Sequence, residues 1–508
     1  MPTSTQATGR RRGALVVLCF VQFMLVLDDT VVNVALPSLR DDLGFGAAGL
    51  TWVVNAYFLA FGGLLLLFGR VADLLGRRRV FLMGVGLFGL ASLACGLAQE
   101  PWQLIAGRFV QGAGAAMAGP AALSLITLLF PGSEERAKVL GVWGGIAALG
   151  GTTGLMVSGA LTGLASWRWI FLINLPVAAA ALVLLPRLVS ESRAGHRPGR
   201  LDVPGAALGT GALLSLVYGL LQEQWLPLVL ALVLAAAFIV VEARSPEPLV
   251  PLSFLASRTR AVANAATLLF SAGFYSMAFL LMLHLQTVLG YKPLTAGAAY
   301  LPYGAGILAG MWLSSRAAIR VGVRRTLVVA FLISAAGLFL LAGVEPGDGY
   351  AAGVLPGMLV TAFGCGLSLP ALTIAAVSGT TGENAGLGSA VFTTFQQVGG
   401  AVGLAILVTL ATRRSDDLVD SVGIRHAATE GFSFALTVTA VLLVLGAILL
   451  AALPGAASRK DVGPRNDVEP RDDVEPQNDV EPRDGVLPRD GVESRKLPES
   501  HADETVEG

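Results

Sequence analysis

Two adjacent carboxylates, Asp28 and Asp29, interrupt an apolar run near the start of the chain, in the segment LDDTVVNVALP of residues 27–37. A carboxylate in hydrocarbon is costly unless it faces a cavity or a partner, and burial favours the form that carries a proton. Asp28 is therefore predicted to couple to protons. The alternative is that one or both aspartates lie at the outer end of a helix, solvated or capping a loop, and it applies above all to Asp29.

One basic residue, Arg108, lies deep within another apolar run, in the segment GRFVQGAG of residues 107–114. Its charge cannot be titrated away, so an arginine there needs hydrogen-bond acceptors. Arg108 could tune the proton affinity of an acid, or it could hold a network of backbone carbonyls in a structural role.

Other polar side chains inside apolar runs are candidates for a substrate pocket. His284 could also titrate near neutral pH, although a single histidine on an apolar helix can equally be hydrogen-bonded and static. These pocket candidates are Asn33, Gln111, His284, Gln286 and Gln397.

The chain shows no motif of a soluble enzyme. The G-x-G-x-x-G pattern of residues 84–89 lies inside an apolar run with no strand before it, and G-K-[ST], H-E-x-x-H, C-x-x-C and G-x-S-x-G are missing from the sequence. We expect no enzyme activity, no metal, no cofactor and no ATP use, with a proton gradient as the energy source. Three cysteines, each within an apolar run, imply no disulfide framework: Cys19, Cys95 and Cys365.

Composition places these residues in a membrane. Of 508 residues, 54% are hydrophobic and only 14% are charged, and the mean hydropathy is +0.70; a soluble surface of this size would need more charge. Apolar runs of about 20 residues, each able to cross the hydrocarbon core as a helix, follow one another. Fourteen spans are predicted: 14–36, 50–69, 80–98, 103–125, 140–163, 168–186, 203–221, 225–242, 262–289, 296–314, 326–344, 351–377, 388–411 and 431–453.

Basic residues are distributed unevenly between alternate connections. One set carries twenty Lys and Arg residues, including those of 10–12 and 77–79, and the opposite set carries six. The positive-inside rule then predicts a multi-pass membrane protein with both termini in the cytoplasm. The bias toward Arg over Lys, together with the abundance of Ala, Gly and Val, suggests a bacterial source, so the expected location is the bacterial plasma membrane. With a net charge of zero, nucleic acid is not expected as a partner.

An internal repeat divides the chain. Six residues separate Arg70 from Gly76 between spans two and three, and six separate Arg316 from Gly322 between spans ten and eleven. If these loops correspond, spans 1–6 match spans 9–14, which is the arrangement of an alternating-access carrier. The predicted divisions are a cytoplasmic N-terminus (1–13), an N-terminal six-helix half (14–188), an inserted two-helix linker (189–261), a C-terminal six-helix half (262–453) and a disordered cytoplasmic tail with hexapeptide repeats (454–508).

Two further features suit a carrier that changes conformation. Asp73 and Arg77, with Gly69 and Gly76, could form a conformational latch, although arginines there also fix the membrane topology. In the fifth span small residues recur, which permits bending or merely tight helix packing. The glycines singled out are Gly150, Gly154 and Gly159.

Together these segments resemble the major facilitator superfamily, and in particular its fourteen-spanner drug/proton antiporters. Four stretches carry the resemblance over about residues 14–453. They are LDDTVVNVALP (27–37), GRVADLLGRR (69–78), GRFVQG (107–112) and SWRWIFLINLP (166–176).

The resemblance implies an all-α membrane bundle of two six-helix halves plus two inserted helices, exporting hydrophobic compounds against inward proton flow. It implies Asp28 as the proton-binding acid, Arg108 as its relay partner, and Asp73 with Arg77 as the latch. Two departures stand out. The proline of the antiporter signature in span five is absent from GLMVSG (154–159), and Gln396 stands where the family often has arginine.

The sequence thus predicts a proton-coupled exporter of an antibiotic, a drug or a self-made metabolite, working as a monomer in the lipid bilayer. One alternative is a facilitator for another small-molecule nutrient. The other is a non-transporting membrane sensor or scaffold that acts through the tail.

Overall fold

The computed structural model describes residues 4–130, 132–191, 201–378 and 385–452. Within these ranges the regular elements are helices, because a chain in hydrocarbon must satisfy its own backbone hydrogen bonds. They are α1 (Ser4–Leu43), α2 (Ala47–Leu75), α3 (Arg77–Gly96), α4 (Pro101–Leu129), α5 (Ser133–Leu164), α6 (Trp169–Leu172), α7 (Asn174–Leu188), α8 (Val203–Leu221), α9 (Trp225–Arg244), α10 (Leu252–Leu255), α11 (Arg258–Leu283), α12 (Pro293–Ala299), α13 (Leu301–Val321), α14 (Val323–Ala342), α15 (Leu355–Ala376), α16 (Ala385–Val422) and α17 (Ile424–Ala451), with π-helical turns at His284–Val288 and Tyr350–Val354. The predicted tail, 454–508, lies outside the described residues.

The all-helical membrane fold is confirmed. Thirteen candidate spans in the described part of the chain are long and apolar enough to cross a membrane. The remaining predicted span, 296–314, corresponds to α12 and α13, which are separated at Tyr300. Pro302 is the second residue of α13, where its missing N–H is tolerated, whereas inside one continuous helix it would remove a backbone hydrogen bond.

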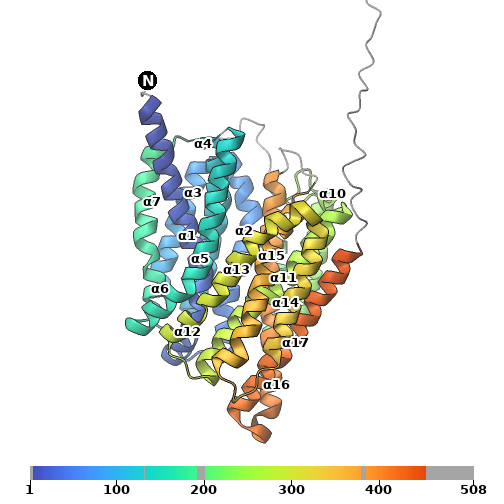
Figure 1. Cartoon of the computed structure of the whole chain (residues 1–508). Helices are drawn as coiled ribbons and strands as arrows, with labels where there is room; N and C mark the ends of the chain where they lie inside the picture. Colours follow the sequence, from blue (N-terminus) through green and yellow to red (C-terminus); the bar gives the residue numbers. More distant parts are fainter. Residues whose placement is uncertain (1–3, 131, 192–200, 379–384, 453–508) are drawn as a thin grey trace, which may run out of the picture. The chain divides into compact units, whose positions relative to one another are not determined.

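The same helix pairings occur twice along the chain. In residues 14–188, which we call the N-terminal half, α4 packs on α2 and α3 while α1 packs on α5; in residues 262–453, the C-terminal half, α15 packs on α13 and α14 while α11 packs on α16. The hairpin of α8 and α9 touches both halves, because α8 contacts α2 and α16. Figure 1 shows the N-terminus and α10 at one end of the bundle and α6, α12 and the α16–α17 connection at the other. The boundaries assigned from the sequence stay predictions.

The two similar loops adopt the same turn. Gly76 joins α2 to α3 with φ +109°, and Gly322 joins α13 to α14 with φ +88°, values that disfavour any residue with a side chain. Two residues later, Arg78 donates to the carbonyl oxygen at the end of α7, and Arg324 donates to the carbonyl oxygen at the end of α17. The loops therefore correspond, and we call the end of the bundle that carries them the arginine-rich end.

Candidate functional site

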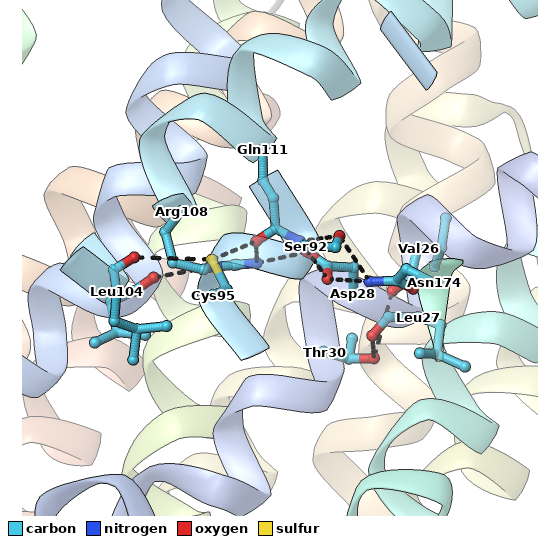
Figure 2. A network of polar contacts seen from close by, with 11 residues as sticks. Val26, Leu27, Asp28, Thr30, Ser92, Cys95, Leu104, Arg108, Gln111 and Asn174 are labelled. Carbon is cyan, nitrogen blue, oxygen red and sulfur yellow. Dashed lines mark hydrogen bonds and ion pairs between the residues drawn. The ribbon is translucent and has the colours of Figure 1, made fainter. Parts of the chain in front are cut away.

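A network of polar side chains is buried inside the N-terminal half, where α1, α3, α4 and α7 meet (Figure 2). None of its members is more than 1% exposed. They are Asp28 on α1, Ser92 on α3, Arg108 and Gln111 on α4, and Asn174 on α7. The apolar run that contains each residue forms a helix, and the crossing of four helices brings the polar groups together.

Asp28 is the acceptor at the centre of this network. Its Oδ2 accepts from Arg108 Nη1 at 2.5 Å. Its Oδ1 accepts from Asn174 Nδ2 at 2.8 Å and from Gln111 Nε2 at 3.1 Å. The carboxylate is therefore fully paired and 0% exposed, so Asp28 does not lie in the solvated position at the outer helix end.

Arg108 contacts both an acid and a backbone carbonyl. It pairs with Asp28, and its Nε donates to the backbone carbonyl of Val53 on α2 at 3.0 Å. Its guanidinium also lies over the Tyr57 ring, 4.5 Å from the centroid. Arg108 thereby connects α1, α2 and α4 through one charged group.

This arrangement holds two opposite charges in a dry site. An isolated charge would be very unfavourable in so dry a site, and the two charges are tolerated because they neutralise each other and satisfy further hydrogen bonds. A proton added to Asp28 would cancel its attraction to Arg108 and leave the guanidinium without a counterion. The connection between the four helices therefore depends on the charge of Asp28.

Asp29 points to a different neighbour. Its Oδ2 accepts from the hydroxyl of Tyr275 on α11 at 3.2 Å, and the same hydroxyl is 3.3 Å from Oε1 of Gln397 on α16. The alternative that placed Asp29 at a solvated helix end is wrong, because α1 continues for fourteen residues to Leu43 and buries this part of its length. Asp29 thus lies between the two halves.

The remaining pocket candidates are not gathered in one place. Gln286 donates to the carbonyl of Val34 on α1 at 2.9 Å and so joins the two halves. His284 is 3% exposed and stacks on Phe432, with ring centroids 4.6 Å apart, and neither ring nitrogen has a hydrogen-bond partner among the described residues. The static, hydrogen-bonded histidine is therefore not what the structure shows. Asn33 is buried, 6% exposed.

The predicted latch residues lie together at the arginine-rich end. Arg77 Nη2 pairs with Asp73 Oδ1 at 3.1 Å across the Gly76 turn. Gly69, one turn before Asp73, has no atom within 4 Å of the place where a Cβ would stand. In this conformation the aspartate is therefore paired within its own loop.

The three glycines of α5 mark close helix approaches. A Cβ at Gly150 would stand 3.4 Å from the carbonyl oxygen of Phe23 on α1, and Gly154 lies against the next turn of the same helix. A Cβ at Gly159 would stand 2.6 Å from the carbonyl oxygen of Pro293 at the start of α12. Tight packing is thus a role of all three, and at Gly159 it joins the two halves at the end opposite the arginines.

Sequence reasoning gave no role to several residues of the site. Asn174 lies in the segment SWRWIFLINLP (166–176) and Ser92 lies in an apolar run. Each is a single polar side chain, and no sequence pattern links either of them to Asp28. Tyr275 had no signal, because a tyrosine on an apolar helix is ordinary. Glu191 follows α7 and accepts from the backbone N–H groups of Arg78 and Arg79. Only the three-dimensional pairing of helices reveals these four.

The sequence matches a known protein family and several of its described members. The family model described as the Major Facilitator Superfamily matches residues 18–404. The puromycin resistance protein pur8 of Streptomyces alboniger is 40% identical over 456 residues, which cover 87% of this chain and 90% of that protein. The lincomycin resistance protein of Streptomyces lincolnensis is 40% identical over 410 residues, covering 78% and 83%.

Another relative and one solved structure extend the comparison. The cephamycin export protein CmcT of Amycolatopsis lactamdurans is 38% identical over 424 residues, covering 80% of this chain and 86% of that protein. The crystal structure of a bacterial homologue of the human lysosomal transporter Spinster, in an inward-facing and unoccupied conformation, superposes with a TM-score of 0.60 at 16% identity, covering 87% and 96%. That likeness shows the shared fold.

Proposed function

The chain belongs to the major facilitator superfamily, and we propose that it is a fourteen-spanner drug/proton antiporter that exports a small-molecule antibiotic or a related metabolite from the cytoplasm. It is a multi-pass membrane transporter and not an enzyme. Support for export comes from relatives named for resistance to puromycin and lincomycin and for cephamycin export.

The Asp28–Arg108 pair is the observation that carries the proton-coupling part of the proposal. It is a 0% exposed ion pair that ties α1 to α4. A proton that enters from outside binds to Asp28, cancels the carboxylate charge and weakens the contacts to Arg108, Gln111 and Asn174. Release of the same proton to the cytoplasm restores them, so one cycle of protonation drives one cycle of helix movement.

Orientation follows from the positive charges. The arginine-rich end faces the cytoplasm because Lys and Arg are retained there, and both termini lie on that side. The opposite end would then be closed to the exterior, through Gly159 against α12 and Gln286 against α1. We assign this conformation to the stage of the cycle in which the exterior is sealed.

Asp73 and Arg77 serve as the latch of the opposite stage. Here they pair with each other, and a Cβ at Gly69 would meet no atom within 4 Å. When the cytoplasmic ends of the two halves approach each other, Asp73 exchanges its partner for a group of the C-terminal half. The latch thus biases the equilibrium between the two conformations.

The test is an accumulation assay in a pump-deficient bacterial host. Wild type should exclude puromycin, lincomycin or a lipophilic dye, and a protonophore should abolish the exclusion. Asp28→Asn should lose it, because the variant carries no titratable group at the centre of the network. Asp41→Asn is the matched control, since Asp41 is an exposed acid on the same helix.

Other outcomes assign other functions. Exclusion that survives a protonophore would indicate a facilitator. Exclusion that survives Asp28→Asn would move the proton site elsewhere. Because the substitution can also destabilise the fold, folded yield is measured by size-exclusion chromatography. A variant that ends at residue 453 should keep full activity, and loss of activity on that deletion would favour the sensor or scaffold.

A further inference from the structure

The α8–α9 hairpin buries two acidic side chains at the ends of its helices, which we call the base of the hairpin. Asp202 precedes the first residue of α8 and is 8% exposed. Glu242 lies in the last turn of α9 and is 3% exposed. Neither forms an ion pair with a basic side chain among the described residues. Acidic side chains this dry are rare unless they are paired.

The packing of α8 against α9 brings these two residues together. A Cβ at Gly209 would stand 3.4 Å from the Phe238 ring, and the same antiparallel register holds near the other end of the hairpin. Four residues before Gly209, Gly205 therefore lies opposite Glu242, which is four residues after Phe238. The backbone N–H of Gly205 donates to Asp202 Oδ1 at 2.8 Å. The two carboxyl groups thus meet at the start of α8.

Each carboxyl group has one oxygen with a backbone donor and one without a partner. Asp202 Oδ1 accepts from Gly205, and Glu242 Oε2 accepts from the backbone N–H of Val250 at 3.2 Å. Asp202 Oδ2 and Glu242 Oε1 are buried and have no hydrogen-bond partner among the described residues. An unsatisfied buried oxygen is costly, and two acceptors cannot bond to each other. One proton between them would satisfy both.

The charges of the pair lead to the same result. Ionised Asp202 and ionised Glu242 repel each other, and burial penalises each charge further. One added proton removes one of the two charges and supplies the missing hydrogen-bond donor. Two carboxyl groups in close contact share a proton for this reason.

The other charged groups around the base are engaged elsewhere or exposed. On α2, Arg70 pairs with Glu247 at 2.7 Å and Asp73 pairs with the start of α3. Residues 385–412 of α16, which also contacts α8, carry no charge. Arg244, at the end of α9, is exposed. The part of the chain that the structure describes therefore places no cation against the two carboxyl groups.

We propose that Asp202 and Glu242 bind one proton between them and that this proton closes the base of the α8–α9 hairpin. The closed pair holds one more proton than an opened pair, whose solvated carboxyl groups are both ionised at neutral pH. The closed form is therefore favoured at low pH and is lost as the pH rises. This inference goes beyond the proposed function, because binding of this proton does not require export.

Opening of the base would reach both halves. Residues 245–251, the linker segment, lead from α9 to α10 and α11, and Glu242 holds this segment through the N–H of Val250. Glu247 of the same segment pairs with Arg70 on α2. Loss of the proton would free the linker segment and weaken its contact with the helix that carries the latch. In the proposed orientation the pair faces the cytoplasm, so it would respond to the cytoplasmic pH.

The test follows the linker segment by thiol labelling of the purified full-length protein in detergent. The native cysteines of the described chain are buried. Val250→Cys adds one thiol and keeps the N–H that Glu242 accepts, and Ser315→Cys, at an exposed position of α13, corrects for the effect of pH on the reaction. Buried carboxyl groups lose their protons between about pH 6 and about pH 9. Over this range the labelling rate at 250 relative to 315 should rise about ten-fold or more.

Two variants isolate the carboxyl pair. In Glu242→Gln the amide donates a hydrogen bond in place of the shared proton and does not titrate, so the relative rate should stay constant over the whole pH range. Asp202→Asn should do the same, and it keeps the test decisive if the first variant folds poorly. Asp41→Asn removes an exposed acid of α1 and should keep the wild-type increase.

Infrared spectroscopy detects the proton itself. A protonated carboxyl group has a carbonyl stretching band that the ionised group lacks. The difference between the spectra of wild type and Glu242→Gln should contain this band at about pH 6 and lose it at about pH 9. A difference spectrum without the band at either pH would contradict a shared proton.

The labelling result can also overturn the proposal. A relative rate that does not change with pH in wild type would do so, and so would an increase that persists in both Glu242→Gln and Asp202→Asn. Neither measurement uses a substrate, so each stands apart from the export test. A protein that opens with rising pH and exports nothing would keep the proton pair and refute the proposed function. Normal export without the pH-dependent opening would do the reverse.

Discussion

The two halves of the molecule share a helix framework and differ at its centre. In the N-terminal half α4 packs against α3 through Gly107 and Gly114, and in the C-terminal half α15 packs against α14 through Gly357 and Gly364. Likewise, α5 packs against α1 through Gly150 and Gly154, and α16 packs against α11 through Gly399 and Gly403. The prolines inside α4 and α15, Pro120 and Pro370, are 250 residues apart, as are the corresponding glycines of these two helices. The contacts thus place the halves in register.

This register pairs four of the five members of the buried network with a less polar residue. Asp28 corresponds to Gly273, Ser92 to Leu338, Arg108 to Met358 and Gln111 to Thr361. Three of the four replacements lie together in the C-terminal half, among apolar side chains such as Phe270 and Met277: Gly273, Leu338 and Thr361. The difference teaches that the framework needs no charge in order to fold. This contrast favours a role other than packing for the charges of the N-terminal half.

The largest expected effect comes from giving the N-terminal half the residue of its counterpart. Arg108→Met leaves Asp28 buried without a counterion, which should lower the free energy of unfolding by about 3–5 kcal/mol. The measurement is thermal unfolding of the purified protein, followed by a thiol-reactive dye or by loss of the monodisperse peak.

The double variant Asp28→Asn with Arg108→Met shows whether the charge is the cause. It removes both ions at once, so it should regain more than half of the lost stability and yet export nothing. If the double variant is as unstable as the single one, the buried network is needed for the stability of the N-terminal half. The difference in charge between the two halves would then reflect stability and not function.

A smaller effect should distinguish the two glycine turns. Alanine at Gly76 or at Gly322 must adopt a positive φ, which costs about 1–3 kcal/mol. At Gly76 the new Cβ would also stand 2.5 Å from Glu191 Oε1, whereas at Gly322 it would meet nothing within 4 Å. Gly76→Ala should therefore lower the melting temperature more than Gly322→Ala. Equal effects would mean that Glu191 moves aside freely.

The smallest effect is expected at an exposed ion pair. Glu223, between α8 and α9, accepts from Arg413 on α16 at 2.5 Å, and this hydrogen bond lowers the pKa of Glu223 from its ordinary 4.5. A lowered pKa contributes stability at neutral pH that disappears as the pH falls through the lowered value. Both side chains are about half exposed, 48% and 58%, so solvent screens the pair.

Glu223→Gln should therefore leave the melting temperature unchanged at pH 7. A clear decrease at pH 7 that vanishes in acid would show that the pair holds the α8–α9 hairpin to the C-terminal half. The same scan on Arg108→Met supplies the contrast between a screened pair and a buried one.

Much of the fold was predictable because a chain in hydrocarbon must form its own backbone hydrogen bonds. Runs of about 20 apolar residues had to become helices, and the Arg70–Gly76 and Arg316–Gly322 loops revealed the repeat. The break at Tyr300 was missed, since the hydropathy of a run does not record where one helix ends and the next begins. Asp28 and Arg108 were singled out because a charge inside a span is expensive. Tyr275 and Asn174 carry no charge, so their presence inside an apolar run is not unusual. Only the packing of helices that are distant in sequence showed their contacts with the two aspartates.

The α8–α9 hairpin brings a consequence for the surrounding lipid. α9 contacts α8 and little else, and its buried side chains are Ala231 and Glu242. Its 20 residues span about 30 Å, the thickness of the hydrocarbon core, and Trp225 and Arg244 stand at its two ends. A thinner or thicker bilayer would first tilt this hairpin, which costs only fractions of a kcal/mol per Å. A tilt of the α8–α9 hairpin would therefore accommodate a change in bilayer thickness without a change in the packing of the two halves.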